Sequence, residues 1–290
     1  MTRRNDAAAR PNRLSVVLVI RSVSGATLFA SAAATVLAGA LHEAVRANAD
    51  LATADLSGTH LRLSCLIGAR LARADLSHAD LSHADLRLAD LAEAKLTSAN
   101  LTRARLTNAT LTKASVSQAD LSQADLCFAS FDGGDLRGAH LAGTDCTGAD
   151  LQGANLAGAD LAGARLTGAR AAGACFAAAR VVKADLGWAD LAGSDLAGAT
   201  LTEANLEWAR LADADLTGAD LTRATLAGAS LVGALLVEAR LELAHVVETD
   251  LSGASLSGAD MTGAKLVRAL LVGANLHQAR LTRSISPGPI

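Results

Sequence analysis

Aspartate and histidine are the side chains of this sequence that could act as acids, bases or metal ligands. Imidazole is a common metal ligand, and His78 and His83 stand five residues apart, but they fall at corners on different sides of the coil predicted below, which does not favour a shared metal ion. The other histidines occur singly, and no nucleophile, base and orienting group stand together in a pattern typical of an active site. The sequence also lacks a glycine-rich phosphate loop. We therefore expect no enzyme, no cofactor and no metal site.

The aspartates belong to a repeat that runs through most of the chain. Leucine or a substitute falls at every fifth residue from Leu51 to Leu281, which gives 47 positions, 39 of them Leu. A small residue stands two positions earlier, Ala in 41 cases, and the polar residue between them is most often Asp. An α-helix would spread these leucines around its axis, and a flat strand would alternate them between its faces. Ala and Leu of one unit share a face of a short extended segment, so a corner must follow. The repeat predicts an all-β solenoid.

Charges at the polar position indicate how many units form one coil. At a separation of 20 residues there are 14 opposite-sign and 3 like-sign pairs, against 10 and 6 at 15 residues and 7 and 10 at 25. Stacked strands about 4.8 Å apart favour opposite charges. We therefore predict four sides of five residues, giving about 12 coils in a rod roughly 56 Å long.

The residue two after each leucine position lies at a corner of this predicted coil. Nine successive units from Gly133 to Gly173 carry Gly there. Because a corner residue with positive φ is easiest for glycine, we expect type II-like corners in this block. We expect another type of corner where the position holds Arg73, His78, Glu93 or Lys113.

These Ala-Asp-Leu-x-x units resemble those of pentapeptide-repeat proteins, and the resemblance covers about four fifths of the chain. It implies a right-handed quadrilateral β-helix with the leucine and the small residue inside. Only 23 of the 47 polar positions are Asp or Asn, which is a mild departure. Some members of the family bind DNA gyrase or related topoisomerases as mimics of duplex DNA. Some dimerise through a C-terminal helix, which the sequence does not predict here.

The predicted organisation has four parts. Residues 1–13 are an Arg-rich disordered terminus, residues 14–45 are apolar without the period, residues 46–285 are the β-helix and residues 286–290 are a proline-containing tail. Three interpretations of residues 14–45 remain open: a helix that caps the first coil, a membrane anchor through residues 14–41, or a secretory signal. Gly39 to Leu41 keep the repeat's register, so the first coil is expected to begin near them.

Cysteine usage and net charge limit the compartments and the classes of partner that are compatible with the sequence. Four cysteines without a CxxC spacing are typical of free thiols in a reducing compartment, which favours a cytoplasmic protein over an anchored or exported one. Residues 1–45 carry a net charge of +3 and residues 46–290 carry −6. Since no basic stripe is present, we expect no direct binding of nucleic acid.

Three groups of outward residues are candidate interaction surfaces. The acidic face comprises residues of one side of the coil: Asp55, Asp75, Asp135, Asp195 and Asp215. Trp188 and Trp208 stand 20 residues apart and should touch. The C-terminal apolar group comprises Leu235, Val237, Leu270 and Val272, and suggests a homodimer through the last coils.

Two functions follow from these observations. The first is a non-enzymatic structural or interaction protein, a rigid rod that displays side chains for a protein partner. The alternative, implied by the resemblance, is a DNA-mimicking modulator of DNA gyrase or a related topoisomerase. Such mimicry needs sustained negative potential, and the alternating charges leave little of it.

Overall fold

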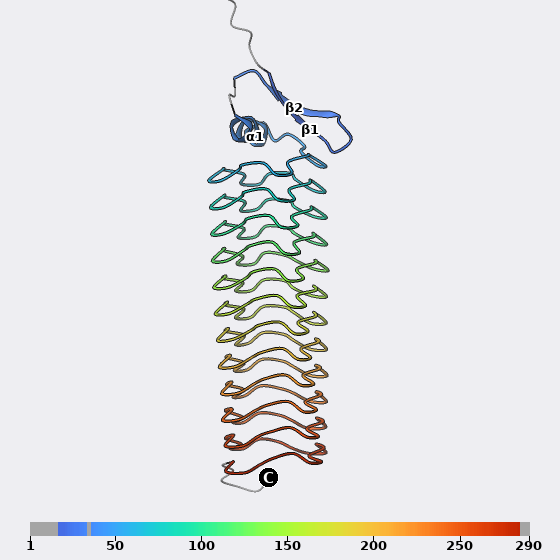
Figure 1. The fold of residues 1–290 in the computed structure, drawn as a ribbon, viewed down its shortest axis with the longest axis vertical. Helices are drawn as coiled ribbons and strands as arrows, with labels where there is room; N and C mark the ends of the chain where they lie inside the picture. Colours follow the sequence, from blue (N-terminus) through green and yellow to red (C-terminus); the bar gives the residue numbers. More distant parts are fainter. Residues whose placement is uncertain (1–16, 34–35, 285–290) are drawn as a thin grey trace, which may run out of the picture.

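The repeat region winds into a long rod of stacked coils (Figure 1). The chain winds this way because the units turn their small residue and the residue at the leucine position inward. The computed structural model describes residues 17–33 and 36–284. From Leu51 to Leu266 the residue at the leucine position is 0–3% exposed, and these side chains fill the interior as one continuous core. The burial of apolar surface is therefore distributed along the whole rod.

Parallel bridges join each polar residue to the residue twenty positions later. They run without a break from Asp50–Arg70 to Asp260–Arg280. Within one such pairing, the N–H of Leu161 donates to the carbonyl of Arg180 on the next coil at 2.7 Å, and the N–H of Asp160 donates to that of Ala139 on the preceding coil at 3.0 Å. The predicted coil of four five-residue sides is confirmed.

All 47 corners have the same backbone conformation. The corner residue has a φ between 54° and 71° in every unit, with Gly at 20 of these positions and other residues at 27. The expected difference between corners is therefore wrong: φ is 59° at Arg73, 60° at His78, and 57° at both Glu93 and Lys113.

The ladder between coils explains this uniform corner. Lys113 and Gly133 occupy the same corner of adjacent coils, and each donates its N–H to the corner of the following coil, at 2.9 Å in both cases. A left-handed conformation costs a non-glycine residue about 1–2 kcal/mol. The hydrogen bonds and core packing of the neighbouring coils fix the corner in spite of that cost.

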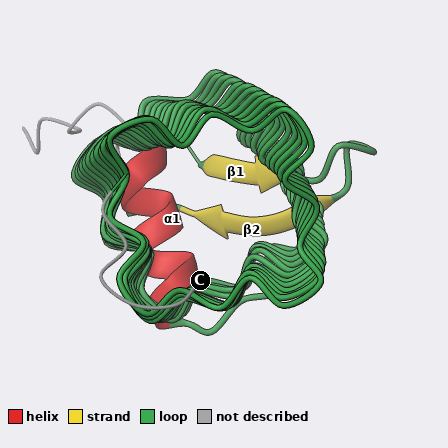
Figure 2. Ribbon diagram, turned by 90° about the horizontal axis from the view of Figure 1, so that it is seen from below, coloured by secondary structure: helices red, strands yellow, loops and turns green. Residues whose placement is uncertain are grey.

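The first coil is covered by a small cap rather than by a helix alone. Strands β1 (Leu18–Arg21) and β2 (Thr27–Ser31) form an antiparallel hairpin, and helix α1 (Leu37–Arg46) follows. Seen along the rod, α1 and both strands lie across the outline of the coils (Figure 2). The prediction of a helical segment over 14–45 is thus right for its last third and wrong for residues 18–31. A run rich in Val, Ile and Leu suits a strand as well as a helix.

Specific contacts attach the cap to the solenoid. The N–H of Asp55 donates to the carbonyl of Arg21 at 2.8 Å, and the N–H of Val23 donates to that of Thr53 at 2.9 Å. Leu41 in α1 is fully buried against the core. The Ser31 hydroxyl donates to the Glu43 carboxylate at 2.6 Å and so ties the hairpin to the helix. Together these contacts provide hydrogen-bond partners for the strand edge of the first coil and cover its apolar end, both of which would otherwise face water.

Helix α1 ends where the solenoid begins. Asn48 has a φ of 51°, its N–H donates to the carbonyl of Val45, and the N–H of Ala49 donates to that of Ala44. This is a Schellman motif, which closes the helix and redirects the chain. The first coil therefore starts at about Asp50, and the expected start near Gly39 is wrong because Gly39 lies inside α1. Of the helices in the described ranges, none has the length and hydrophobicity needed to span a bilayer.

The C-terminal end differs from the capped end. Leu271, Leu276 and Leu281 are only partly buried, although they hold the same position in the unit as the fully buried leucines before them. The predicted disordered terminus (1–13) and proline-containing tail (286–290) lie outside the described residues.

Candidate interaction surfaces

The outward carboxylates and amides first serve the corner that follows them. The side-chain oxygen of each of the 23 Asp and Asn residues at the polar position accepts the N–H two residues later; examples are Ala162 to Asp160 at 3.0 Å and Ala157 to Asn155 at 3.1 Å. That N–H takes no part in the ladder between coils. Asp and Asn are therefore favoured by an Asx-turn, a role that the sequence reasoning missed. The signal was present in the frequency of these two residue types.

Ion pairs between coils use the second oxygen of many of these carboxylates. Among the described residues, eleven ion pairs join residues twenty positions apart. In the alternating series Asp150, Arg170, Asp190, Arg210, the pairs observed are Arg170–Asp150 and Arg210–Asp190, at 3.5 and 3.3 Å. The cations in these eleven pairs are 51–77% exposed, so each pair contributes about 0–1 kcal/mol. Their larger effect is to cancel charge along the rod.

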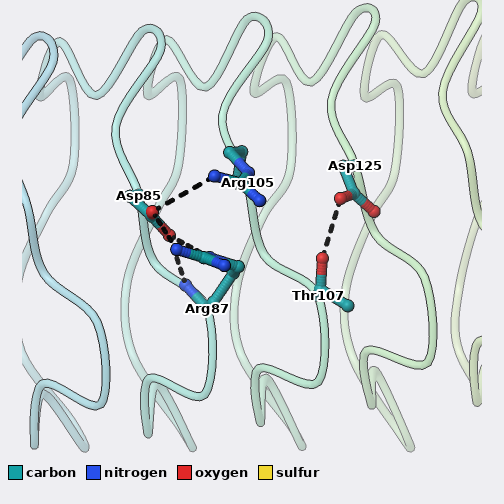
Figure 3. A network of polar contacts seen from close by, with 5 residues as sticks. All are labelled: Asp85, Arg87, Arg105, Thr107 and Asp125. Carbon is teal, nitrogen blue, oxygen red and sulfur yellow. Dashed lines mark hydrogen bonds and ion pairs between the residues drawn. The ribbon is translucent and has the colours of Figure 1, made fainter.

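One carboxylate shows both roles together with a local arginine (Figure 3). Arg87 donates Nε and Nη2 to the two oxygens of Asp85, both at 2.7 Å, and Nη1 of Arg105 on the next coil lies 3.5 Å from Oδ2. The hydrogen bonds from the Arg87 side chain lower the pKa of Asp85 against the opposing effect of burial. Further along the same side, the Thr107 hydroxyl donates to Asp125 at 2.7 Å. The carboxylates here are held in place by local contacts.

The acidic face is brought together only in part. Asp55 pairs with Asp75 across adjacent coils, as Asp195 does with Asp215, so two stacks of like charge exist. Asp135 stands apart from both stacks and is bound by Arg137, with Nη2 and Oδ2 2.8 Å apart. The Arg137 side chain lowers the pKa of Asp135. The acidic face therefore comprises two separated pairs of carboxylates and one neutralised member.

The two tryptophans form a stacked pair on the surface. Their ring centroids lie 5.4 Å apart with an interplanar angle of 15°. Trp188 is 65% exposed and Trp208 is 48% exposed. The predicted contact is confirmed, and the pair presents a large rigid aromatic surface to solvent.

The C-terminal apolar group lies on and just before the last coils. Leu270 is 52% exposed and Val272 is 75% exposed, whereas Leu235 is 44% exposed and Val237 is partly buried. Leu270 and Val272 stand beside the half-open interior of the last coil, while Leu235 lies more than a coil earlier. The structure thus joins Leu270 and Val272 to the open end of the rod.

The titratable groups of the described residues bear on reactivity through their clustering and their pKa shifts. Within residues 17–33 and 36–284, no three His, Cys, Asp or Glu side chains gather closely enough to hold a metal ion. Burial raises the pKa of the Cys146 thiol to about 12. Burial, followed by the carboxylates of Asp125 and Asp145, raises the pKa of Cys127 to about 12 as well. Neither thiol is a nucleophile near neutral pH, since the thiolate is the reactive form.

Comparison with known proteins identifies the class of this solenoid. The sequence profile of pentapeptide repeats matches eight copies, in segments that together cover residues 69–285. The chain therefore belongs to the pentapeptide-repeat family, and its solenoid is the right-handed quadrilateral β-helix of that family. Members of the family are in general structural or interaction proteins rather than enzymes.

Solved structures of other pentapeptide-repeat proteins resemble this chain. HetL, involved in heterocyst differentiation regulation in the cyanobacterium Nostoc sp. strain PCC 7120, is 34% identical over 77% of this chain and 90% of its own, with a TM-score of 0.46. Full-length QnrB1, a plasmid-mediated fluoroquinolone resistance protein, is 18% identical over 67% of this chain and 92% of its own, with a TM-score of 0.22. A pentapeptide repeat protein of the Arabidopsis thaliana thylakoid lumen is 29% identical over 43% of this chain and 67% of its own, with a TM-score of 0.12. No curated protein matches the chain.

Proposed function

We propose that this protein is a non-enzymatic interaction scaffold, a rigid rod whose outer side chains bind a protein partner. The observation that carries the proposal is the filled interior: Leu and Ala occupy it along the rod from Leu51 to Leu266. A filled solenoid has no room for a substrate, so binding must use the outer surface. The unbroken ladder between coils keeps that surface rigid, which lowers the entropy lost on association.

Affinity capture tests this proposal. The full chain, immobilised through its N-terminus, is incubated with an extract of the native host, and a β-solenoid of similar length and charge serves as the control. We expect the rod to capture one defined protein in a constant ratio to the immobilised chain. We expect the control solenoid not to capture that protein. Equal recovery of every bound protein on both solenoids would argue against a specific scaffold.

A topoisomerase partner is the alternative function. The like-charge stack Asp195–Asp215 favours it, because it concentrates negative charge on one side of the rod. The stack Asp55–Asp75 contributes less, because Lys95 follows Asp75 on the next coil and offsets part of its charge. The eleven ion pairs between coils weigh against it by neutralising much of the remaining surface. A supercoiling assay with DNA gyrase separates the functions: a DNA mimic inhibits supercoiling or protects it from a quinolone, and the Asp195→Ser/Asp215→Ser variant loses that effect.

Self-association through the C-terminal coils is compatible with either function. The partly buried leucines of the last coil, together with Leu270 and Val272, provide the apolar surface for a second copy. The opposite end is closed by the cap, so a two-fold contact between C-terminal ends is favoured over a head-to-tail fibre. Sedimentation velocity should show a dimer that Leu270→Ser/Val272→Ser dissociates. A monomer at all accessible concentrations would rule this out.

A further inference from the structure

One corner of the rod carries every exposed aromatic side chain in the described residues. Leu88, Phe128, Trp188 and Trp208 are separated by multiples of twenty residues and therefore lie along one line parallel to the rod axis. Their exposures are 63%, 62%, 65% and 48%. Of the other aromatic residues, Phe131 and Phe176 are buried in the core and Phe29 is partly buried in the cap. We call these four residues the aromatic corner; it spans six coil steps, or roughly 29 Å.

Glycines on the following coils hold these rings flat against the rod. A Cβ at Gly148 would lie 2.5 Å from the Phe128 ring, and a Cβ at Gly228 would lie 2.5 Å from the Trp208 ring. Each ring thus covers the next corner where a side chain is missing. Trp188 in turn lies on Trp208. The Phe128 and Trp208 rings thus pack on the backbone of the next coil while their outer faces stay exposed, an arrangement suited to interface anchors.

Trp188 keeps one face open for a planar group. Its other face lies on Trp208, toward the C-terminal end, so the open face points back along the rod toward Gly168. Nothing lies within 4 Å of the position that a Cβ would take at Gly168. The corner therefore has a notch between the Phe128 ring, which covers Gly148, and the open face of Trp188.

A shallow hollow continues the same corner toward the cap. It has a volume of about 280 Å³ and is lined by Ile67, Arg87, Leu88, Thr107 and Asn108. Ile67 is 37% exposed and adds an aliphatic side chain next to Leu88. A partner that lies along the corner can place an apolar side chain here and a planar group at Trp188.

The charges beside the notch favour a cation as that planar group. On the two sides that meet at this corner, the polar positions from 125 to 210 hold Asp125, Asp145, Asp150, Asp185 and Asp190 against Arg165, Arg170 and Arg210. Arg165 and Arg170, on the coil of the notch itself, pair with Asp145 and Asp150, and Arg210 pairs with Asp190. Asp125 and Asp185 are left without an ion pair among the described residues. Glu207, exposed and next to Trp208, adds a sixth acid. The surroundings of the open indole face are therefore net negative. A guanidinium stacks on an indole face and is attracted by both the ring and these carboxylates.

We propose that the aromatic corner binds an extended protein segment in which arginine accompanies apolar side chains, with an arginine stacked on Trp188. This inference rests on the proposed scaffold function and names the surface and the chemistry of its partner. A neutral polysaccharide could also stack on aligned rings, but it would make no use of the carboxylates of Asp125, Asp185 and Glu207, which are in no ion pair within the described part of the chain. Arginine uses both the rings and the acids.

Intrinsic fluorescence tests the proposal, because Trp188 and Trp208 are the only tryptophans in the chain. The probes for the full-length protein are a synthetic peptide of alternating Arg and Leu, the same peptide with Glu in place of Arg, and a soluble β-glucan oligosaccharide. We expect saturable quenching by the Arg–Leu peptide only. Quenching by the oligosaccharide but not by the Arg–Leu peptide, or equal binding of both peptides, overturns the proposal.

Variants locate the binding on the corner. With a dye-labelled Arg–Leu peptide, we expect Trp188→Ala to weaken binding roughly 2- to 30-fold and Trp188→Phe to restore part of the loss. The control is Leu243→Ala, which removes an exposed leucine (49%) at a different corner and should leave binding unchanged. Equal losses in both alanine variants would contradict the assignment. The affinity capture from the native host is repeated with the Trp188→Ala/Trp208→Ala variant. If the variant captures the partner as well as the wild type does, the scaffold function stands and the aromatic corner is not its binding site.

Discussion

Oδ2 of Asp190 lies 3.3 Å from Nη1 of Arg210, the residue at the same position on the next coil. Oδ1 of Asp190 accepts the N–H of Ala192 at 3.2 Å. The two oxygens of one carboxylate thus bind different parts of the rod: one closes the corner of its own coil, and the other reaches the neighbouring coil. Asp can therefore make both contacts at the polar position, whereas Asn can make only the hydrogen bond to its own corner.

The first prediction concerns that division of roles. Asp190→Asn keeps an oxygen for the Ala192 N–H and loses the ion pair, so it should cost about 0–1 kcal/mol of unfolding free energy. Asp190→Ala loses both contacts and should cost about 1 kcal/mol more, by analogy with the loss of a side-chain cap. Urea unfolding followed by circular dichroism measures both variants. Equal costs for Asn and Ala would show that the corner hydrogen bond contributes nothing.

The second prediction concerns the left-handed corners. Ala178 and Gly158 occupy the same corner of adjacent coils, with φ values of 54° and 65°. Ala178→Gly should stabilise the protein by up to about 1 kcal/mol because glycine adopts positive φ without steric cost. Gly158→Ala should destabilise it by about 1 kcal/mol, although nothing lies within 4 Å of the added Cβ. Urea midpoints that shift in the same direction for both variants would contradict the assigned backbone.

The contrast between Lys113 and Gly133 shows which part of the fold the sequence could predict. The leucine period and the charges determine the sides and the size of the coil, because both repeat along the chain and depend on local burial and pairing. The corner conformation could not be inferred from the residue type, since the hydrogen bonds to the next coil impose it on Lys and Gly alike. The hairpin β1–β2 was missed because its outer edge pairs with the first coil, a tertiary contact that no local pattern records.

Some features of the candidate surfaces could likewise be predicted from the sequence, and others could not. Contact between Trp188 and Trp208 follows directly from the coil length. The alignment of Leu88 and Phe128 with that pair was also present in the numbering, and becomes visible only when each corner is followed along the whole rod. The loss of Asp135 from the acidic face depends on the side-chain conformation of Arg137, two residues away. No spacing rule predicts such a contact.

The third prediction compares the middle of the core with its open end. Leu161 is fully buried, so Leu161→Ala should cost about 2–5 kcal/mol through lost burial and the cavity that remains. Leu281 is partly exposed in the last coil, and Leu281→Ala should cost less than half as much. Urea unfolding provides the comparison. If the two variants are equally destabilised, the last coil must be covered in solution, as dimerisation through that end would require.

The fourth prediction concerns acid pH. Side-chain hydrogen bonds lower the pKa of Asp85 through Arg87 and that of Asp80 through Ser82. Such a carboxyl binds more protons in the unfolded state than in the folded state. Its stabilising effect is therefore complete above the unfolded pKa near 4 and is lost as the pH falls through the lower folded value.

Thermal unfolding between about pH 2 and pH 7 measures this effect. The Tm should be nearly constant above about pH 5 and decrease below about pH 4. Asp85→Asn should lower the Tm at neutral pH and reduce the acid-dependent decrease, because one of the responsible carboxyls is gone. A Tm that rises on acidification would contradict the direction of these pKa shifts.

The twenty-residue coil determines which side chains share a face or a corner, and far-ultraviolet circular dichroism of the two indoles tests it most directly. Stacked indoles 5.4 Å apart should give an exciton couplet in the folded full-length protein. Trp188→Phe and Trp208→Phe should each abolish the couplet completely, since each removes one member of the pair. The spectrum of Trp188→Phe/Trp208→Phe is subtracted from each of the others to isolate the indole contribution. A wild-type indole contribution equal to the sum of the two single-tryptophan contributions would show that the indoles are apart, and the register of the coils would then be wrong.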